Sequence, residues 1–145
     1  MGHAARTFSP LAVALLFTAG ALPAKAQEGG APPSLSLELN GTEATERGCR
    51  LTFVAANRLG EDIERAAYEV ALFGTDGLVK RLTVLDFKAL PDGQTKVRQF
   101  DLPDIDCEGL GRVLVNGATV CEGGEKNACM ERLKTATRGS VAFGT

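Results

Sequence analysis

The sequence predicts a mostly β protein that folds as a single antiparallel β-sandwich. Three observations lead to this class. Short segments of alternating apolar and polar residues recur along the chain, turn-forming Gly, Pro and Asp residues separate them, and no long helical pattern lies between them. Four cysteines are available to staple such a domain with two disulfides. An Ig-like sandwich of about seven strands with one short helix fits best. A small barrel is the alternative, and the Trp usual in immunoglobulin domains is absent.

Seven segments have the period of two that is typical of a strand buried on one face. The leucines of residues 34–40, for example, alternate with polar neighbours. Within 95–102, Val97 is out of phase with Phe100 and Leu102, which predicts a bulge or bend in that strand. The predicted strands are residues 34–40, 49–56, 67–73, 78–87, 95–102, 112–119 and 140–143.

Turn signals and one helical segment separate the strands. Residues 74–77 (GTDG) predict a hairpin, because Asp-Gly tolerates the positive φ that tight hairpins require. Residues 90–93 (LPDG) predict a second turn, and Asn40-Gly41 predicts a turn that ends the first strand. Asn40 also opens an Asn-Gly-Thr glycosylation sequon, which has meaning only in a host that glycosylates secreted proteins. Residues 126–134 place Cys129 among apolar residues at helical spacing, which predicts the short helix.

The first 26 residues have the three parts of a cleavable secretory signal peptide. Arg6 supplies the basic start, residues 11–22 the apolar centre, and Ala24-Lys25-Ala26 the cleavage site before Gln27. The apolar run is shorter than the roughly 20 residues that cross a membrane. No adjacent arginine pair is present, so we expect the general secretory route and a periplasmic or secreted protein.

Removal of residues 1–26 leaves a flexible Gly- and Pro-rich leader at 27–33 and a β-sandwich domain at 34–145. Sixteen basic residues oppose 18 acidic ones, and two of the basic residues lie in the signal peptide. The remaining chain is therefore mildly acidic, which argues against nucleic acid and anionic membranes as partners. We expect the partner to be a periplasmic or extracellular protein, with no membrane insertion after cleavage.

The four cysteines allow three pairings, and the predicted strand order chooses among them. If each connection reverses direction, Cys49 and Cys107 lie at one end of the sandwich, and Cys121 and Cys129 lie at the other. Bridged Cα atoms lie within about 7 Å of each other, whereas an eight-residue strand spans about 26 Å. The sequence therefore predicts the disulfides Cys49–Cys107 and Cys121–Cys129. The lack of a C-x-x-C motif favours structural bridges over a redox-active pair.

Several catalytic chemistries have no residues to support them. The only histidine is His3, inside the signal peptide, which removes Ser-His-Asp and Cys-His machinery and His-ligated zinc from the mature protein. No serine stands in a G-x-S-x-G or S-x-x-K context, and no phosphate-binding glycine motif is present. We expect a protein that is not an enzyme and holds no cofactor.

Carboxylates are the chemistry that remains. Asp101, Asp104, Asp106 and Glu108 cluster in one segment and form a candidate calcium set, although they do not match an EF-hand loop. The alternative is a solvated acidic turn between two strands. Asp86 with Asp101 is a conceivable glycosidase-type acid pair, but a sandwich this small has little cleft for a sugar chain.

Residues 49–121 resemble a family of small uncharacterised exported proteins of Gram-negative bacteria, some of them labelled Tat pathway signal sequence domain proteins. The resemblance lies in the segments GCRLTFVAANRLG, YEVALFGTDGLVKRLTVLDFKALP, KVRQFDLP and GRVLVNGATVC. It implies a periplasmic setting and brings no functional residue with it.

These observations predict an exported, non-enzymatic binding or accessory module whose ligand is unknown. The alternative is a secreted hydrolase inhibitor that uses the rigid Cys121–Cys129 loop as its wedge. A small hydrolase built on carboxylates is a distant third.

Overall fold

The computed structural model of the protein describes residues 1–2 and 30–145. The predicted cleavage site, and nearly all of the predicted signal peptide, lie outside the described residues. Residues 31–145 form one compact unit, and the residues before them are not placed relative to it. No helix in the described part of the chain is long and apolar enough to cross a membrane.

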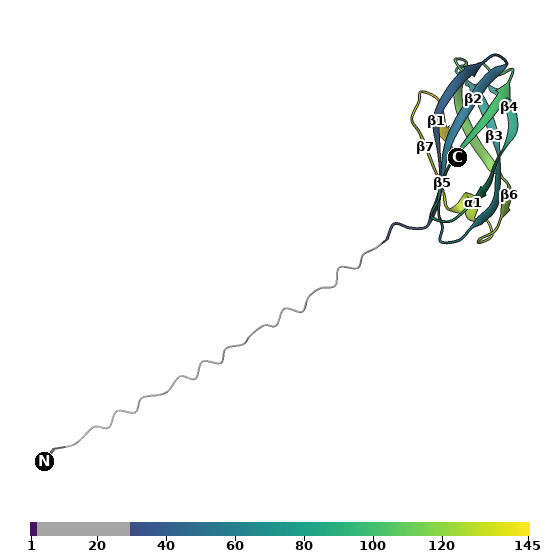
Figure 1. Ribbon diagram of the computed structural model, residues 1–145. Helices are drawn as coiled ribbons and strands as arrows, with labels where there is room; N and C mark the ends of the chain where they lie inside the picture. The colour runs from purple at the N-terminus through teal and green to yellow at the C-terminus, as the bar shows by residue number, and fades with distance from the viewer. Residues whose placement is uncertain (3–29) are drawn as a thin grey trace. The chain divides into compact units, whose positions relative to one another are not determined.

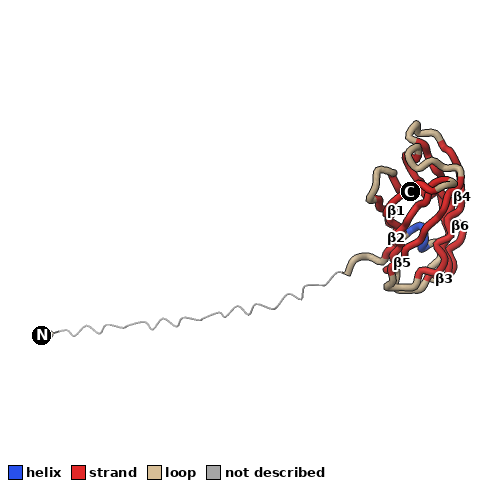
Figure 2. The backbone as a smooth tube through the Cα atoms, turned by 45° about the horizontal axis from the view of Figure 1, so that its top comes forward, coloured by secondary structure: helices blue, strands red, loops and turns tan. Residues whose placement is uncertain are grey.

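Two four-stranded sheets pack face to face, as Figures 1 and 2 show, with one short helix near one end of the sandwich. The first sheet has the strand order β5-β2-β1-β7 and the second has the order β4-β3-β6-β8. The elements are β1 (Ser34–Thr45), β2 (Gly48–Arg58), β3 (Ile63–Gly74), β4 (Val79–Leu90), β5 (Thr95–Pro103), β6 (Leu110–Glu122), α1 (Ala128–Glu131), β7 (Leu133–Thr137) and β8 (Ala142–Gly144).

The core lies between the sheets and follows directly from the period of two. Alternate residues of β2, including Leu51 and Phe53, are fully buried, while their neighbours face outward. The Phe53 ring meets the rings of Phe87 and Phe100 edge to face at centroid distances of 5.4 and 5.9 Å. Tyr68 packs against Phe87 within the second sheet. The Phe53–Phe87 contact crosses between the sheets and joins them to each other.

The structure has eight strands, where the sequence predicted seven. The additional strand is β7, which begins inside the predicted 126–134 helix; only Ala128–Glu131 is helical. The sandwich is also not wholly antiparallel, because β7 pairs parallel with β1 and β8 pairs parallel with β6. After β6 the chain crosses to the first sheet at the end where β1 begins, so β7 must run in the same direction as β1.

Two local predictions are wrong. Asn40-Gly41 does not end the first strand: β1 continues to Thr45, and the pairing with β2 shifts by one residue between Leu39 and Gly41, which makes this site a β-bulge. Conversely, β5 pairs with β2 in unbroken register through Val97. Val97 is 60 % exposed on the outer face. It alternates out of phase with Phe100 and Leu102 because its side chain faces solvent, and the strand has no bulge there.

The turns at 74–77 and 90–93 are present as predicted. The Gly77 N–H donates to the Gly74 carbonyl at 2.9 Å, and Gly77 has a φ of 78°. The Gln94 N–H donates to the Pro91 carbonyl at 3.2 Å. These turns join β3 to β4 and β4 to β5.

Two disulfides close the fold, Cys49–Cys107 and Cys121–Cys129, the pairs expected from the strand order. Cys49 opens β2 and Cys107 precedes β6, whereas Cys121 ends β6 and Cys129 lies in α1. Because β2 and β6 run in the same direction, the bridges lie at opposite ends of the sandwich. All four cysteines are paired, which indicates an oxidising compartment.

Candidate functional site

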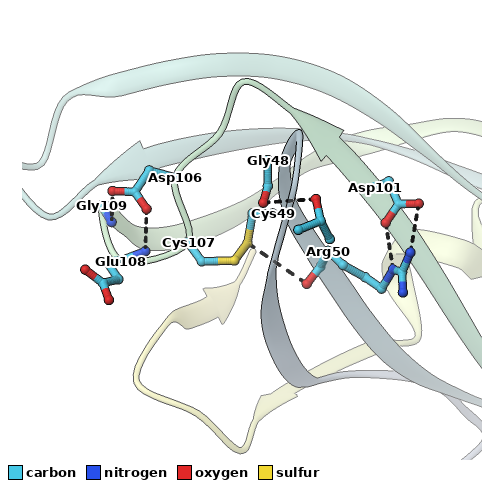
Figure 3. The surroundings of a disulfide bond; sticks show 9 residues. Gly48, Cys49, Arg50, Asp101, Asp106, Cys107, Glu108 and Gly109 are labelled. Carbon is cyan, nitrogen blue, oxygen red and sulfur yellow. Dashed lines mark hydrogen bonds and ion pairs between the residues drawn. A yellow bond between two sulfur atoms is a disulfide. The ribbon is translucent and has the colours of Figure 1, made fainter.

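The acidic segment 101–108 lies beside the Cys49–Cys107 disulfide, and Figure 3 shows the hydrogen bonds that the Asp101 and Asp106 carboxylates accept. Arg50, on β2, donates to both carboxylate oxygens of Asp101, on β5, at 2.7 and 3.3 Å. This guanidinium lowers the pKa of the Asp101 carboxyl. The Asp106 carboxylate accepts hydrogen bonds from the N–H groups of Glu108 and Gly109 at 3.1 and 3.2 Å. Two of the four candidate calcium ligands are therefore engaged in holding the strand pair and the turn.

The structure does not bring the candidate calcium ligands together. No three Asp, Glu, His or Cys side chains among the described residues gather as a metal site would require. Asp101 points outward from the first sheet opposite Arg50, while Asp104 sits in the following turn with a φ of 59°. The Asp104 N–H donates to the Arg47 carbonyl at 2.8 Å, which ties this turn to the β1–β2 hairpin. The geometry is that of an acidic turn between two strands.

A hollow of about 490 Å³ opens at the same end of the sandwich, and both acidic and basic side chains line it. It lies between the β1–β2 hairpin and the end of β5. A Cβ added at Gly48 would lie 2.0 Å from the Leu102 carbonyl oxygen, so the close approach of β2 to β5 requires glycine there. The lining residues are Thr45, Glu46, Arg47, Arg50, Asp101, Leu102 and Pro103.

Asp86 and Asp101 do not form a pair. Asp86 stands opposite Ala67 on the outer face of the second sheet, and Asp101 stands on the outer face of the first. The Asp86 carboxylate accepts from Arg65 at 2.9 Å and from the Lys88 ammonium at 2.8 Å. These two cations hold the pKa of Asp86 well below its usual range. Since the core separates the two carboxylates, no substrate bond can lie between them.

The Cys121–Cys129 loop is exposed and tightly fastened. The Glu61 carboxylate accepts from the Glu125 N–H at 2.6 Å, and the buried Tyr68 hydroxyl donates to the Cys129 carbonyl at 2.9 Å. Burial raises the pKa of Tyr68. Residues 124–127 remain exposed between these attachments. The sequence indicated this loop through its cysteines alone; the anchors from β3 and the β2–β3 loop come from the tertiary structure.

The outer face of the second sheet carries a patch of exposed apolar side chains. Val79, Leu82 and Val84 of β4 are 55 %, 57 % and 52 % exposed. Phe73, on β3, stands opposite Val79, and Leu114, on β6, stands opposite Ala71, the partner of Leu82. We call Phe73, Val79, Leu82, Val84 and Leu114 the apolar face.

The apolar face has a signal in the sequence itself, in the segment that forms β4. Both alternating sets of the VKRLTVLDF segment contain two large apolar residues, Leu82 and Val84 in one and Leu85 and Phe87 in the other. Only one side of a strand faces the core of a sandwich, and in β4 this side carries the buried residues Leu85 and Phe87. The other set must face outward.

The outer face of the first sheet carries ion pairs and polar contacts, and its exposed apolar set is smaller. Arg50 pairs with Asp101, and Arg138 pairs with Glu38 at 2.8 Å. A Gln99–Thr52 hydrogen bond of 3.1 Å joins β5 to β2. Val97 meets Val54 on the first sheet, but the second sheet presents the larger exposed apolar set, Val79, Leu82 and Val84, which marks it as the candidate binding face.

Searches against protein-family models, curated proteins and solved structures find no match to this chain.

Proposed function

We propose that this protein is an exported, non-enzymatic binding module that holds a protein partner through the apolar face. The observation that carries the proposal is the exposure of Val79, Leu82 and Val84 beside one another on β4. Contiguous apolar surface of this kind marks contact sites in soluble proteins. An unguarded apolar strand is also a risk for aggregation, so its presence favours a partner that covers it.

The chemistry of the chain supports binding over catalysis. Histidine occurs only at position 3, and all four cysteines are bridged. The two carboxylates of the conceivable acid pair, Asp86 and Asp101, are held by cations on opposite outer faces. No general base or nucleophile therefore stands ready among these groups.

The finer description of the fold belongs to the same proposal. The strands β1, β2 and β5 share one sheet while β3 and β6 share the other, as strands A, B, E and C, F do in Ig domains. The parallel edge strands β7 and β8 depart from that pattern. We propose an Ig-like sandwich with rearranged final strands, located in the periplasm or secreted, as the signal-peptide pattern and the family resemblance also suggest.

The proposal is tested by placing a photo-crosslinking amino acid at Leu82 and identifying what it captures in cells that express the full chain. We expect one dominant partner, and we expect capture to fall at least tenfold when Leu114→Lys is added. The matched control places the crosslinker at Val97, an exposed apolar position on the first sheet. Equal capture from both positions, or none from Leu82, would contradict the proposal.

An inhibitor function remains the second candidate, and the fastened Cys121–Cys129 loop favours it. Rigid exposed loops lose little conformational freedom on binding, which suits insertion into an active site. Lys126 is exposed at the loop centre. If a captured partner is a hydrolase, Lys126→Glu should relieve its inhibition, whereas Lys96→Glu on β5 should not. Inhibition that is insensitive to Lys126 would remove this candidate.

A further inference from the structure

The two sheets have four edge strands among the described residues, and three of them are guarded against pairing with another chain. β7 has five residues and β8 has three. β5 has nine residues and carries the charged residues Lys96, Arg98 and Asp101 beside its single exposed valine. Short strands and charges are the usual protection of sheet edges. The twelve-residue β4 is the remaining edge.

Backbone alternation shows which groups of β4 face its free edge. The Gly74 N–H donates to the Leu78 carbonyl and the Gly74 carbonyl accepts from Gly77, both at 2.9 Å, so Gly74 faces β4. Every second residue of β3 before Gly74 faces β4 as well, and the partners of these residues are Arg81, Thr83 and Leu85. The backbone groups of the intervening residues of β4, Leu82 and Val84, therefore point away from β3.

Two arginines cover the ends of this free edge and leave its centre open. Arg98, on β5, donates to the carbonyls of Phe87 and Ala89 at 2.7 and 3.1 Å. Arg81 turns its guanidinium to the Pro103 carbonyl at 2.7 Å. Between them, the backbone groups of Leu82 and Val84 face the open edge, and the side chains of both residues are exposed.

We propose that the β4 edge pairs antiparallel with the β4 edge of a second copy, about a two-fold axis at Thr83. This inference rests on the proposed function, since it names the partner of the apolar face. Leu82 of one copy then stands opposite Val84 of the other, and the reciprocal pair follows from symmetry. Both residues contribute outward-facing backbone groups, so each pair forms two hydrogen bonds.

The apolar side chains select this register over its neighbour. With the axis at Thr83, Leu82 and Val84 of the two copies meet as two apolar pairs. With the axis at Val84, the apolar Leu82 would stand opposite the charged Asp86. The charged side chains at the two ends keep the partners within their own chain, Lys80 with Asp76 at 2.6 Å and Asp86 with Arg65 and Lys88.

The result is a continuous eight-stranded sheet with a joined apolar strip across its centre. The test uses protein recovered from cells that express the full chain and measures its mass in solution over a range of concentrations. We expect a doubled mass at high concentration and only the single-chain mass for Val84→Lys, which places a charge in the strip. Val97→Lys, the matched control on the guarded edge, should leave the doubled mass unchanged.

The register is tested by cysteine cross-linking. Thr83→Cys places two thiols opposite each other in a non-hydrogen-bonded pair, where Cα atoms lie about 4.5 Å apart, within the range that a disulfide spans. We expect Thr83→Cys to give a cross-linked dimer on mild oxidation and Val97→Cys to give none. Preferential cross-linking of Val84→Cys would overturn the register.

Failure of this inference is distinguishable from failure of the proposed function. A single-chain mass at every concentration, together with capture of a different protein from Leu82, overturns the second-copy pairing and leaves the binding function standing. A single-chain mass with no capture overturns both. A doubled mass that Val84→Lys does not change also overturns the pairing through β4.

Discussion

Asn57, at the end of β2, has a fully buried side chain whose hydrogen bonds join three segments. Its amide nitrogen donates to the carbonyls of Glu61 and Leu90 at 2.8 and 2.7 Å, and its amide oxygen accepts from the Leu59 N–H at 2.9 Å. No other buried polar or charged side chain occurs in the described part of the chain. Burial of a polar group is stabilising only when its partners are present, so the two loops around Asn57 depend on it.

Asn57→Ala should lower the free energy of unfolding by about 3 kcal/mol, because the buried Leu90 carbonyl and the part-buried Glu61 carbonyl and Leu59 N–H lose this partner. Chemical denaturation of the variant and the parent measures the difference. Asn116→Ala is the matched control, since its exposed amide contacts Glu69 at the surface. That control should change stability by less than about 0.5 kcal/mol. Equal losses from the two substitutions would contradict the role assigned to Asn57.

Asp86→Asn should lower stability at neutral pH and lose its effect in acid. The cations Arg65 and Lys88 hold the pKa of Asp86 below its unfolded value, which is about 3.9. The folded state therefore gains stability above that pH, by about 1 kcal/mol, and loses it as the pH falls further. Melting temperatures of parent and variant should differ near pH 7, and the gap should narrow steadily as the pH falls below the unfolded value. Asp104→Asn, outside the ion pairs of the described residues, is the control; a constant gap for Asp86→Asn would contradict the ion-pair account.

At the scale of elements, each disulfide fastens a different part of the sandwich. Cys49–Cys107 links the start of β2 to the chain before β6 across 58 positions of sequence. Cys121–Cys129 spans eight positions and fixes α1 against the end of β6. Long closed loops restrict the unfolded chain more than short ones. The first bridge therefore stabilises the whole fold, and the second mainly holds the loop between β6 and α1 in place.

Replacing Cys49 and Cys107 together by Ala should lower the free energy of unfolding by about 4 kcal/mol, and replacing Cys121 and Cys129 by about 2.5 kcal/mol. The estimates follow from the two sequence separations of 58 and 8. Each pair has one fully buried member, so lost packing contributes similarly to both. Denaturant melts of the two double variants make the comparison. A larger loss for the second pair would contradict the chain-entropy argument.

At the scale of the whole molecule, the two outer faces differ in how much large apolar surface they expose. Both faces carry ion pairs, Arg50–Asp101 and Arg138–Glu38 on the first sheet and Arg65–Asp86 on the second, but only the second also carries the apolar face. A sandwich needs only one apolar side on each sheet to build its core. The second apolar side of β4 is therefore unnecessary for folding, which is why we assign it to binding.

The exported protein should begin at Gln27. The expected signal-peptide cleavage follows Ala26, after the pattern of an apolar run and small residues. Intact mass of the protein recovered from cells measures this directly. Ala24→Lys with Ala26→Lys, which removes both small residues of the cleavage site, should retain the 26 residues. Parent protein that keeps them and stays with the membrane would contradict the exported-domain prediction.

Much of the fold could be predicted from local pattern. The alternation of Leu35, Leu37 and Leu39, the turn at 74–77 and the two disulfide pairs all depend on neighbours in sequence or on strand direction. The period of two selects the buried side chains before any partner strand is known.

Only the tertiary structure decided the features that need a neighbour from elsewhere in the chain. Residues 133–137 become a strand because β1 offers them a parallel edge, and Asn40 sits in a bulge because β2 continues beside it. Neither position carries a pattern that announces the pairing. Which apolar side of β4 stays outside depended on how the two sheets stack. The sequence by itself therefore determined which side chains form the core and which cysteines pair. The packing of the two sheets decided which apolar side chains stay exposed, because the exposure of a residue depends on the neighbours that cover it.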